Sequence, residues 1–221
     1  MNNAAVDLRT GANPSHAVLW LHGLGADGHD FEPIVPELTR RHWPAIRFIF
    51  PHAPIQPVTI NGGMPMRSWY DIRGMDIASR ADETGIRASI AATHRWLDHL
   101  VQSGIPAGNI LLAGFSQGGA VILNAMLRYP ERLAGAIALS TYLPLHDKVA
   151  AEAHAANAAT PIFMAHGSAD PVVPLALGRQ SADVLISAGY PLTWHQYRMQ
   201  HSVCAEEVAD IAAFIESRFI A

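Results

Sequence analysis

Residues 114–118 read Gly-Phe-Ser-Gln-Gly and match the pattern G-x-S-x-G around Ser116. An apolar run over residues 110–113 precedes this pattern, and a segment with helical composition follows it. This context is typical of a nucleophilic serine on a tight strand-to-helix turn, where small flanking residues relieve backbone crowding. A glycine-rich turn with an ordinary helix-capping serine is the alternative, and the flanking segments favour the nucleophile.

A serine hydroxyl becomes an effective nucleophile only when a neighbouring base takes its proton. In hydrolases with this pattern the acid follows the serine along the chain, and the histidine comes last. Asp170 lies in a loop directly after the apolar run 161–165, and Pro171 stiffens the backbone beside it. His201 lies between the last predicted strand and the last predicted helix. We therefore expect Ser116, Asp170 and His201 to form a catalytic triad.

Other acids and histidines that follow Ser116 compete for these roles. Asp147 is the competing acid because it follows the apolar run 134–139, whereas Asp183 lies inside a predicted helix and fits a solvated charge. The other histidines lie in connections, at a strand end or within a strand: His146, His154, His166 and His195. Their positions fit the base less well than the loop of His201.

A glycine-rich segment, Leu-His-Gly-Leu-Gly-Ala-Asp-Gly, occupies residues 21–28 after the first predicted strand. It matches the dinucleotide pattern G-x-G-x-x-G, which requires a helix directly after it and an acid at the end of the next strand. The next strand ends at Phe50 without an acid, and a helix begins only near Phe31. We therefore favour a loop that donates a backbone N–H to an oxyanion, with Leu24 and Gln117 as the two donors. Glycines needed only for a tight turn are the alternative.

The composition narrows the class of protein. Of 221 residues, 50% are hydrophobic and 15% are charged, which excludes intrinsic disorder. The net charge of −4 leaves no basic excess for binding phosphates, so we expect no nucleic-acid partner. The 12 histidines show no HExxH motif or clustered Cys/His spacing, so we expect no metal site.

Cysteine usage and hydropathy indicate the compartment. The single cysteine, Cys204, rules out an internal disulfide and fits a reducing cytosol. The N-terminal residues lack a basic segment followed by an apolar one, and no apolar run approaches the roughly 18 residues of a membrane span. We expect a cytoplasmic protein without stable membrane insertion.

Apolar runs and amphipathic stretches alternate along the chain. We expect strands at residues 17–21, 46–50, 110–113, 134–139, 161–165 and 192–197. We expect helices at residues 82–103, 118–129, 175–188 and 205–219. Most strands are continuous apolar runs, as in a parallel sheet covered on both faces, whereas residues 192–197 alternate like an edge strand. The sequence predicts one α/β domain over residues 1–221, with a mostly parallel sheet, helices on both faces, and a long functional loop at residues 51–76.

Six blocks in this order resemble the carboxylesterase/acyl-protein thioesterase family, also called phospholipase/carboxylesterase. The blocks are residues 22–28, 51–54, 68–71, 114–119, 166–174 and 201–207. The resemblance extends over about residues 17–216 and implies an α/β-hydrolase fold without a required cofactor. It assigns Ser116, Asp170 and His201 to the triad, and Leu24 and Gln117 to the oxyanion hole. It also implies that residues 54–74 help to shape the acyl site.

The resemblance leaves the substrate open between short acyl esters and long acyl groups on proteins or lysophospholipids. Thr141 stands where similar proteins often have glycine, next to Tyr142, and the added side chain predicts a narrower pocket. We therefore expect a serine carboxylesterase for short- to medium-chain carboxylic esters or thioesters. The alternative is an acyl-protein thioesterase or lysophospholipase for long-chain acyl groups.

Other residues of the chain have two interpretations each. Apolar side chains before helix 82–103 fit either acyl-chain contacts or packing inside the loop: Met64, Met66, Trp69 and Met75. We expect Cys204 to begin the last helix as a small buried residue and Asp71 to anchor its loop by hydrogen bonds. We also expect a homodimer. A non-catalytic binding protein on a hydrolase scaffold would usually have lost Ser116 or His201, and both are present.

Overall fold

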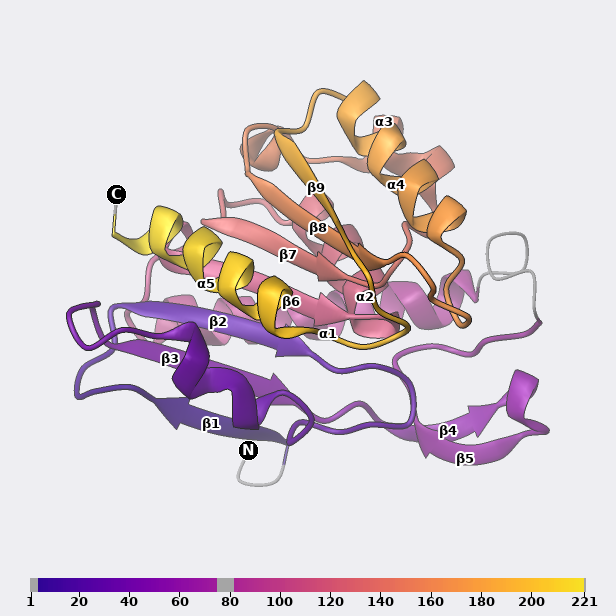
Figure 1. The fold of residues 1–221 in the computed structure, drawn as a ribbon, viewed down its shortest axis with the longest axis horizontal. Coiled ribbons are helices and arrows are strands. Elements are labelled where there is room, and N and C mark those ends of the chain that lie inside the picture. Colours follow the sequence, from indigo (N-terminus) through magenta and orange to yellow (C-terminus); the bar gives the residue numbers. More distant parts are fainter. Residues whose placement is uncertain (1–3, 75–81, 221) are drawn as a thin grey trace.

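The computed structural model describes residues 4–74 and 82–220, and its centre is a seven-stranded sheet (Figure 1). The strands are β1 (Ala5–Arg9), β2 (His16–Leu21), β3 (Ile46–Pro51), β6 (Ile110–Phe115), β7 (Gly135–Leu139), β8 (Ile162–Gly167) and β9 (Leu192–Tyr197). They lie in the order β1-β3-β2-β6-β7-β8-β9. All neighbours are parallel except β1 and β3. The mostly parallel α/β sheet that the sequence predicts is therefore confirmed.

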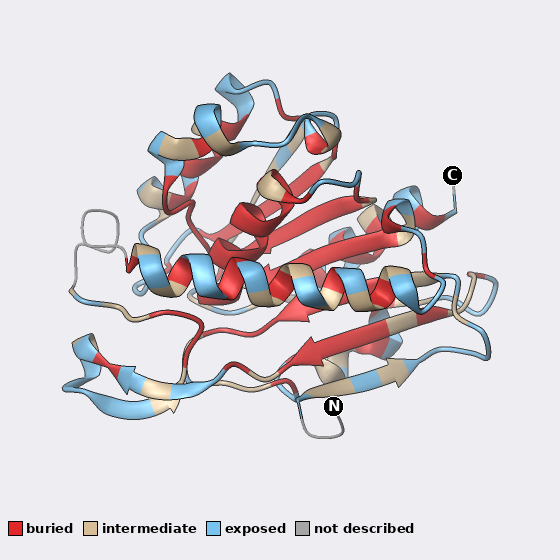
Figure 2. Cartoon of the chain, turned by 180° about the vertical axis from the view of Figure 1, so that it is seen from behind, coloured by how far each residue is buried: buried red, intermediate tan, exposed pale blue. Residues whose placement is uncertain are grey.

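Helices cover both faces of the sheet. One face carries α1 (Glu83–Gln102), α2 (Gln117–Arg128) and α4 (Leu175–Ser187), and the other carries α5 (Ala205–Phe219) and the 3-10 helix η1 (Glu32–Leu38). Seen from behind, buried residues alternate with exposed and half-buried ones along α1 (Figure 2). The shorter helices are η2 (Thr59–Asn61), η3 (Ala107–Asn109), η4 (His146–Lys148), α3 (Val149–Glu152) and η5 (Ala155–Asn157).

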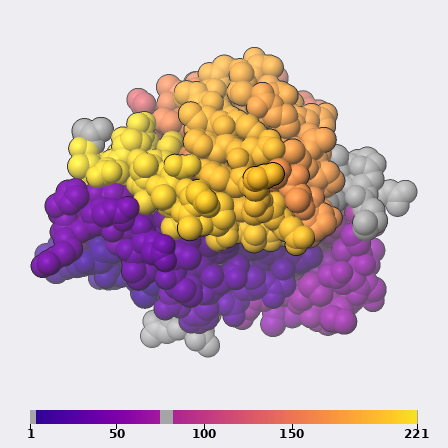
Figure 3. Space-filling model, viewed as in Figure 1, coloured from indigo at the N-terminus to yellow at the C-terminus, as the bar shows by residue number. Residues whose placement is uncertain are grey.

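The last helix packs against a segment from the N-terminal part of the chain. In the space-filling view the C-terminal part of the chain lies directly on the N-terminal part (Figure 3). Val208, Ile211 and Ile215 of α5 share one buried apolar cluster with Val35 and Leu38 of η1. Because α5 begins directly after the loop that contains His201, this packing fixes where that loop ends. Within the described residues, no helix is long and apolar enough to cross a bilayer.

The structure contains strands that the sequence did not predict. β1 is a half-exposed antiparallel edge strand, and its alternating polar residues give no continuous apolar run. The segment predicted as a loop at 51–76 contains a two-stranded hairpin of β4 (Ile55–Val58) and β5 (Met64–Arg67). The position of β9 at the sheet edge is confirmed.

The strand register brings the predicted site to one edge of the sheet. Leu21 pairs with Gly114, Phe115 pairs with Leu139, and Gly167 pairs with Tyr197. Because these are the carboxyl ends of parallel strands, the loops that follow them meet at the same edge. Ser116, the acid loop after β8 and the histidine loop after β9 begin there.

Candidate active site

Ser116 lies on the tight turn between β6 and α2. Its backbone has φ 53° and ψ −118°, a combination that costs a non-glycine residue on the order of 1–3 kcal/mol. The turn has no room for larger neighbours, since a Cβ on Gly114 would lie 2.6 Å from the Gly118 backbone and one on Gly118 would lie 2.2 Å from the Leu21 carbonyl oxygen. The Ser116 N–H donates to Leu139 O at 2.8 Å. The surrounding sheet therefore holds the serine in the strained geometry of a nucleophile elbow.

The structure brings Asp170 and His201 together. His201 Nδ1 lies 2.6 Å from Asp170 Oδ2, so the protonated Nδ1 donates to the carboxylate and leaves Nε2 unprotonated. The other carboxylate oxygen accepts the N–H groups of Val172 at 2.8 Å and Val173 at 2.9 Å. These bonds fix the carboxylate plane. The His201 ring lies 4.7 Å from the ring of Phe115, the residue directly before Ser116.

His166 lies on the other side of the acid. Its Nε2 donates to Val173 O at 2.9 Å and lies 3.5 Å from Asp170 Oδ2. Burial lowers the pKa of this imidazole, which favours the neutral form. His166 therefore helps to hold the acid loop, and the sequence analysis, which placed it at a strand end, did not identify this contact.

The competing residues lie elsewhere. Asp147 is exposed and lies 3.8 Å from Lys148, and Asp183 pairs with Arg179 on the surface of α4. His195 lies in β9, and its ring stacks on the ring of Phe163 in β8. None of these acids contacts His201 in the described part of the chain.

One predicted amide donor follows the serine directly, and the other follows Gly23, which lies close to the serine. Gly23 is adjacent to it, since a Cβ built on Gly23 would lie 3.6 Å from Ser116 Cβ. Gln117 is the first residue of α2, so its N–H belongs to the unpaired first turn of the helix. Among the described residues, the backbone N–H groups of Leu24 and Gln117 have no hydrogen-bond partner. Both are free to donate to an oxyanion, and the helix N-terminus adds a partial positive charge.

The side chain of Gln117 connects the serine turn to the segment before α1. Its Oε1 accepts the Trp69 N–H at 2.8 Å, and its Nε2 donates to Tyr70 O at 2.7 Å. Ser68 Oγ also contacts both amide atoms of Gln117, at 3.4 and 3.1 Å. The sequence analysis assigned only the backbone of Gln117, because its partners lie 47–49 positions away.

Trp69 and Tyr142, both predicted substrate contacts, lie inside the protein. Trp69 is 5% exposed, and its Nε1 donates to His22 O at 2.9 Å. Tyr142 is 4% exposed and shares a hydrogen bond of 2.8 Å with the Tyr70 hydroxyl. Burial raises the pKa of Tyr142 to about 12, so its hydroxyl stays protonated. Their contact with a substrate stays a prediction.

Thr141 packs against the helix that follows the serine. Its side chain is fully buried, and its Oγ1 donates to Ser116 O at 2.6 Å. A Cβ on Gly119 would lie within 2.7–2.9 Å of three Thr141 side-chain atoms. In this arrangement the side chain supports the turn of Ser116. Its predicted role as a wall of the acyl pocket stays a prediction.

The methionines have different environments. Met66 is half-buried, and its Sδ lies 3.3 Å from Asn61 Nδ2 and 4.0 Å from a Cβ built on Gly25. Met66 therefore lies beside the loop that carries Leu24. Met64 is 61% exposed, and Met75 lies outside the described residues.

Asp71 and Cys204 have structural environments. Asp71 accepts hydrogen bonds from the Thr59 N–H at 2.7 Å and the Thr59 hydroxyl at 2.6 Å, so its predicted anchoring role is confirmed. Cys204 is the N-cap of α5, as predicted, but it is half-exposed instead of buried. The loop that carries His201 ends there and keeps the cysteine near the surface.

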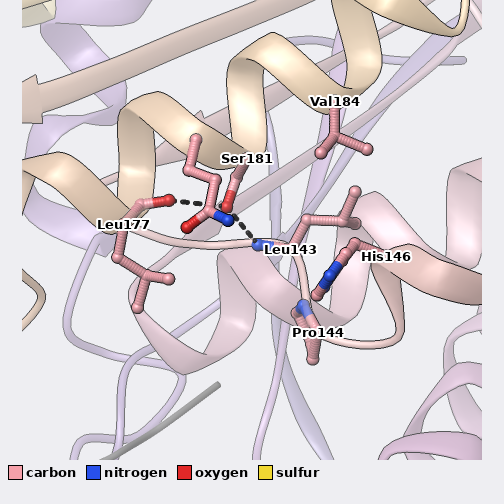
Figure 4. Close-up of a pocket in the computed structure, with 7 residues that line it drawn as sticks. Leu143, Pro144, His146, Leu177, Ser181 and Val184 are labelled. Atoms are coloured by element: carbon pink, nitrogen blue, oxygen red, sulfur yellow. Dashed lines mark hydrogen bonds between the residues drawn. The ribbon is translucent and has the colours of Figure 1, made fainter. Parts of the chain in front are cut away.

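A separate cavity lies between the segment after β7 and α4. It is lined mainly by Leu143, Pro144, Leu177 and Val184, and Figure 4 shows these side chains around it. Ser181 Oγ accepts the Leu143 N–H at 2.9 Å and donates to Leu177 O at 2.8 Å. None of the three residues of the predicted triad lines this cavity.

Comparison with known proteins identifies the family. The family model described as Phospholipase/Carboxylesterase matches residues 2–218. The chain belongs to this family. It is 43% identical over 216 residues to a protein of Neurospora crassa named acyl-protein thioesterase 1, covering 94% of this chain and 88% of that protein. A protein of Mycosarcoma maydis with the same name is 38% identical over 234 residues, covering 98% and 96%.

Solved structures agree with the family. The crystal structure of Arabidopsis thaliana SOBER1 matches with a TM-score of 0.86 at 31% identity, covering 92% of this chain and 98% of that chain. Zea mays acyl-protein thioesterase 2 matches with a TM-score of 0.80 at 26% identity, covering 97% and 98%. The chain therefore has the α/β-hydrolase fold and is a serine hydrolase enzyme of the carboxylesterase family.

Proposed function

We propose that this chain hydrolyses long-chain acyl thioesters, with acylated cysteine as the natural substrate class, through an acyl-enzyme on Ser116. The observation that carries the chemistry is the Asp170–His201 pair at 2.6 Å, located at the same sheet edge as the strained Ser116. The names of the relatives in Neurospora crassa and Mycosarcoma maydis support the thioester as substrate. They favour the long-chain alternative over the short-chain carboxylesterase that the sequence analysis placed first.

In the first half of the reaction, His201 Nε2 takes the proton of Ser116 Oγ as Oγ attacks the thioester carbonyl carbon. The carbonyl π electrons move to oxygen, and the N–H groups of Leu24 and Gln117 stabilise the oxyanion. When the intermediate collapses, the carbon–sulfur bond breaks and His201 gives its proton to the leaving thiolate. Asp170 stabilises the imidazolium that exists between these two proton transfers.

In the second half, water replaces the thiol. His201 Nε2 takes a proton from the water as its oxygen attacks the acyl-enzyme carbonyl, and the same amides hold the second oxyanion. Collapse breaks the bond to Ser116 Oγ, which recovers its proton from His201, and the fatty acid leaves. Each step uses only groups of this chain, the substrate and water.

The chain-length proposal is supported by the placement of Thr141. The predicted short pocket rested on Thr141 with its bulky neighbours and on the loop of Trp69. A threonine packed against α2 gives no reason for a short limit. Each methylene that enters an apolar site contributes up to about 0.8 kcal/mol, or roughly fourfold in kcat/KM. Preference should therefore increase with chain length until the site is full.

A chain-length series tests this proposal. We would measure kcat/KM for S-acetyl, S-octanoyl and S-palmitoyl cysteine peptides, for the matching p-nitrophenyl esters and for a palmitoyl lysophospholipid, with Ser116→Ala as the control. We expect the palmitoyl thioester to be the best substrate and the Ser116→Ala variant to be inactive. A maximum at or below eight carbons would restore the short-chain carboxylesterase, and a preference for palmitoyl lysophospholipid over palmitoyl thioester would indicate a lysophospholipase.

A further inference from the structure

His22, at the end of β2, has both ring nitrogens bonded to the main chain. The residue is 2% exposed. Its Nδ1 lies 2.7 Å from Gly23 O, and its Nε2 lies 3.1 Å from the Ala53 N–H. The ring also lies 5.2 Å from the Trp69 ring. The imidazole is therefore held in a single orientation by groups of three separate segments.

These partners determine the protonation state of the ring. A backbone N–H can only donate, so Nε2 must accept from Ala53 and carries no proton. The proton of the neutral imidazole is then on Nδ1, which donates it to the Gly23 carbonyl oxygen. Burial lowers the pKa of His22, and this also favours the neutral ring.

The Gly23 carbonyl belongs to the same peptide unit as the Leu24 N–H. The unit is planar, and all described peptide bonds are trans, so the C=O and the N–H point in opposite directions. A side chain that holds the carbonyl oxygen therefore fixes the direction of the N–H. The Leu24 N–H has no partner in the described residues, and Gly23 lies beside Ser116.

We propose that His22 is a positioning residue: its Nδ1–H holds the Gly23 carbonyl so that the Leu24 N–H points to the oxyanion. The inference rests on the proposed function only in requiring acyl transfer at Ser116, whatever the acyl chain. If the peptide unit rotated, an oxygen lone pair would face the developing negative charge in place of a donor. The resulting repulsion would appear in the transition state and not in substrate binding.

The rest of the loop has its own attachments, and His22 makes the shortest hydrogen bond to the Gly23–Leu24 peptide unit. The Gly25 N–H donates to Arg67 O at 2.9 Å, and the Gly28 N–H donates to His52 Nδ1 at 3.0 Å. The Ala26 N–H also reaches Gly23 O, but at the longer distance of 3.3 Å. Removing the Nδ1–H therefore weakens the hold on one peptide unit while the loop remains attached on both sides.

Two variants test the hydrogen bonds of the two His22 ring nitrogens separately. In His22→Asn the amide Nδ2 takes the position of Nδ1 and keeps a donor for Gly23 O, while the acceptor for Ala53 is lost. In His22→Gln the amide Oε1 takes the position of Nε2 and keeps the acceptor, while the donor for Gly23 is lost. Each variant loses one buried main-chain bond, and His22→Asn should be the less stable of the two because it leaves the Ala53 N–H without an acceptor, whereas Gly23 O keeps the Ala26 N–H in His22→Gln. They form a matched pair.

The assay is p-nitrophenyl acetate hydrolysis, with active sites counted by a fluorophosphonate probe. We expect His22→Gln to lower kcat by roughly 10²–10³, as for the loss of one oxyanion donor, with little change in KM. We expect His22→Asn to retain kcat within about tenfold of the wild type, because it keeps the donor. The inhibition constant of an alkyl trifluoromethyl ketone, whose adduct with Ser116 carries an oxyanion, should increase in His22→Gln by the same factor by which kcat/KM decreases.

The results also separate this inference from the proposed function. Equal kcat values for the two variants, or ketone inhibition that stays unchanged while kcat decreases, would overturn the role of His22. A decrease explained by fewer titrated active sites would overturn it too. A wild type that hydrolyses p-nitrophenyl acetate but no long-chain thioester would contradict the proposed substrate and leave the His22 comparison valid.

Discussion

The side chain of Gln117 offers a quantitative test of how the site is held together. Leucine at this position has a similar volume but neither donates nor accepts hydrogen bonds. Gln117→Leu leaves the Trp69 N–H without its acceptor and removes one of the donors to Tyr70 O. The Tyr70 carbonyl keeps the Ser68 hydroxyl as a donor, so only the Trp69 N–H is left unsatisfied, at a cost of about 1–3 kcal/mol, and the lost bond to Tyr70 O adds about 1 kcal/mol. The variant should therefore lose about 2–4 kcal/mol of unfolding free energy.

The assay is urea unfolding followed by circular dichroism, together with thermal unfolding. For a chain of this size, a loss of this magnitude corresponds to a decrease in Tm on the order of 10 °C. Gln102→Leu at the exposed end of α1 is the control, and its stability should change by no more than about 0.5 kcal/mol. If Gln117→Leu unfolds at the same urea concentration as the control, the hydrogen bonds of Gln117 do not stabilise the site and the reasoning is wrong.

Three further predictions concern the acid, the threonine and a buried carboxyl group. Asp170→Asn should lower kcat by about 10⁴ at neutral pH, because an amide neither stabilises the His201 imidazolium nor selects its tautomer. A decrease in kcat of less than tenfold in a steady-state assay would contradict this prediction. Thr141→Gly should lower kcat without moving the chain-length optimum, because the side chain packs on Gly119; a shift toward longer chains would assign it to the pocket after all. Burial raises the pKa of Glu207 from 4.5 to about 8, so the folded protein favours the protonated carboxyl group. The contribution of this group to the free energy of unfolding is complete below pH 4.5 and is lost as the pH rises through 8. Chemical unfolding at several pH values should therefore show that the unfolding free energy decreases less with rising pH in Glu207→Gln than in the wild type. The same pH dependence in both proteins would contradict this prediction.

Much of the sheet could be predicted from local pattern. Strands such as Ile110–Phe115 and Ile162–Gly167 are buried on both faces, so they appear as continuous apolar runs bounded by glycine or proline. The loops of Asp170 and His201 could be located because parallel strands bring their carboxyl ends to one edge. The sequence order of acid and histidine left several candidates, and their positions relative to the predicted strands and helices favoured these two residues over Asp147, Asp183 and the other histidines.

The missed elements have weak local signals. β1 is half-exposed and contains charged residues, and β4 and β5 each contain a proline, which argues against strands in a pattern-based prediction. The bonds of the Gln117 side chain and the Ala53–His22 bond join residues that are 31–49 positions apart. Nothing in the local pattern of either segment indicates these partners, because they are set by tertiary packing.

The central claim is that Ser116 carries the acyl group during hydrolysis. The most direct measurement is to mix the enzyme with an S-palmitoyl cysteine peptide, quench the reaction in acid within its first turnovers, and map the digested protein by mass spectrometry. The account predicts a palmitoyl ester on the peptide that contains Ser116 and none in Ser116→Ala. Thioester hydrolysis at the wild-type rate by Ser116→Ala, with no acyl group on that peptide in the wild type, would contradict it.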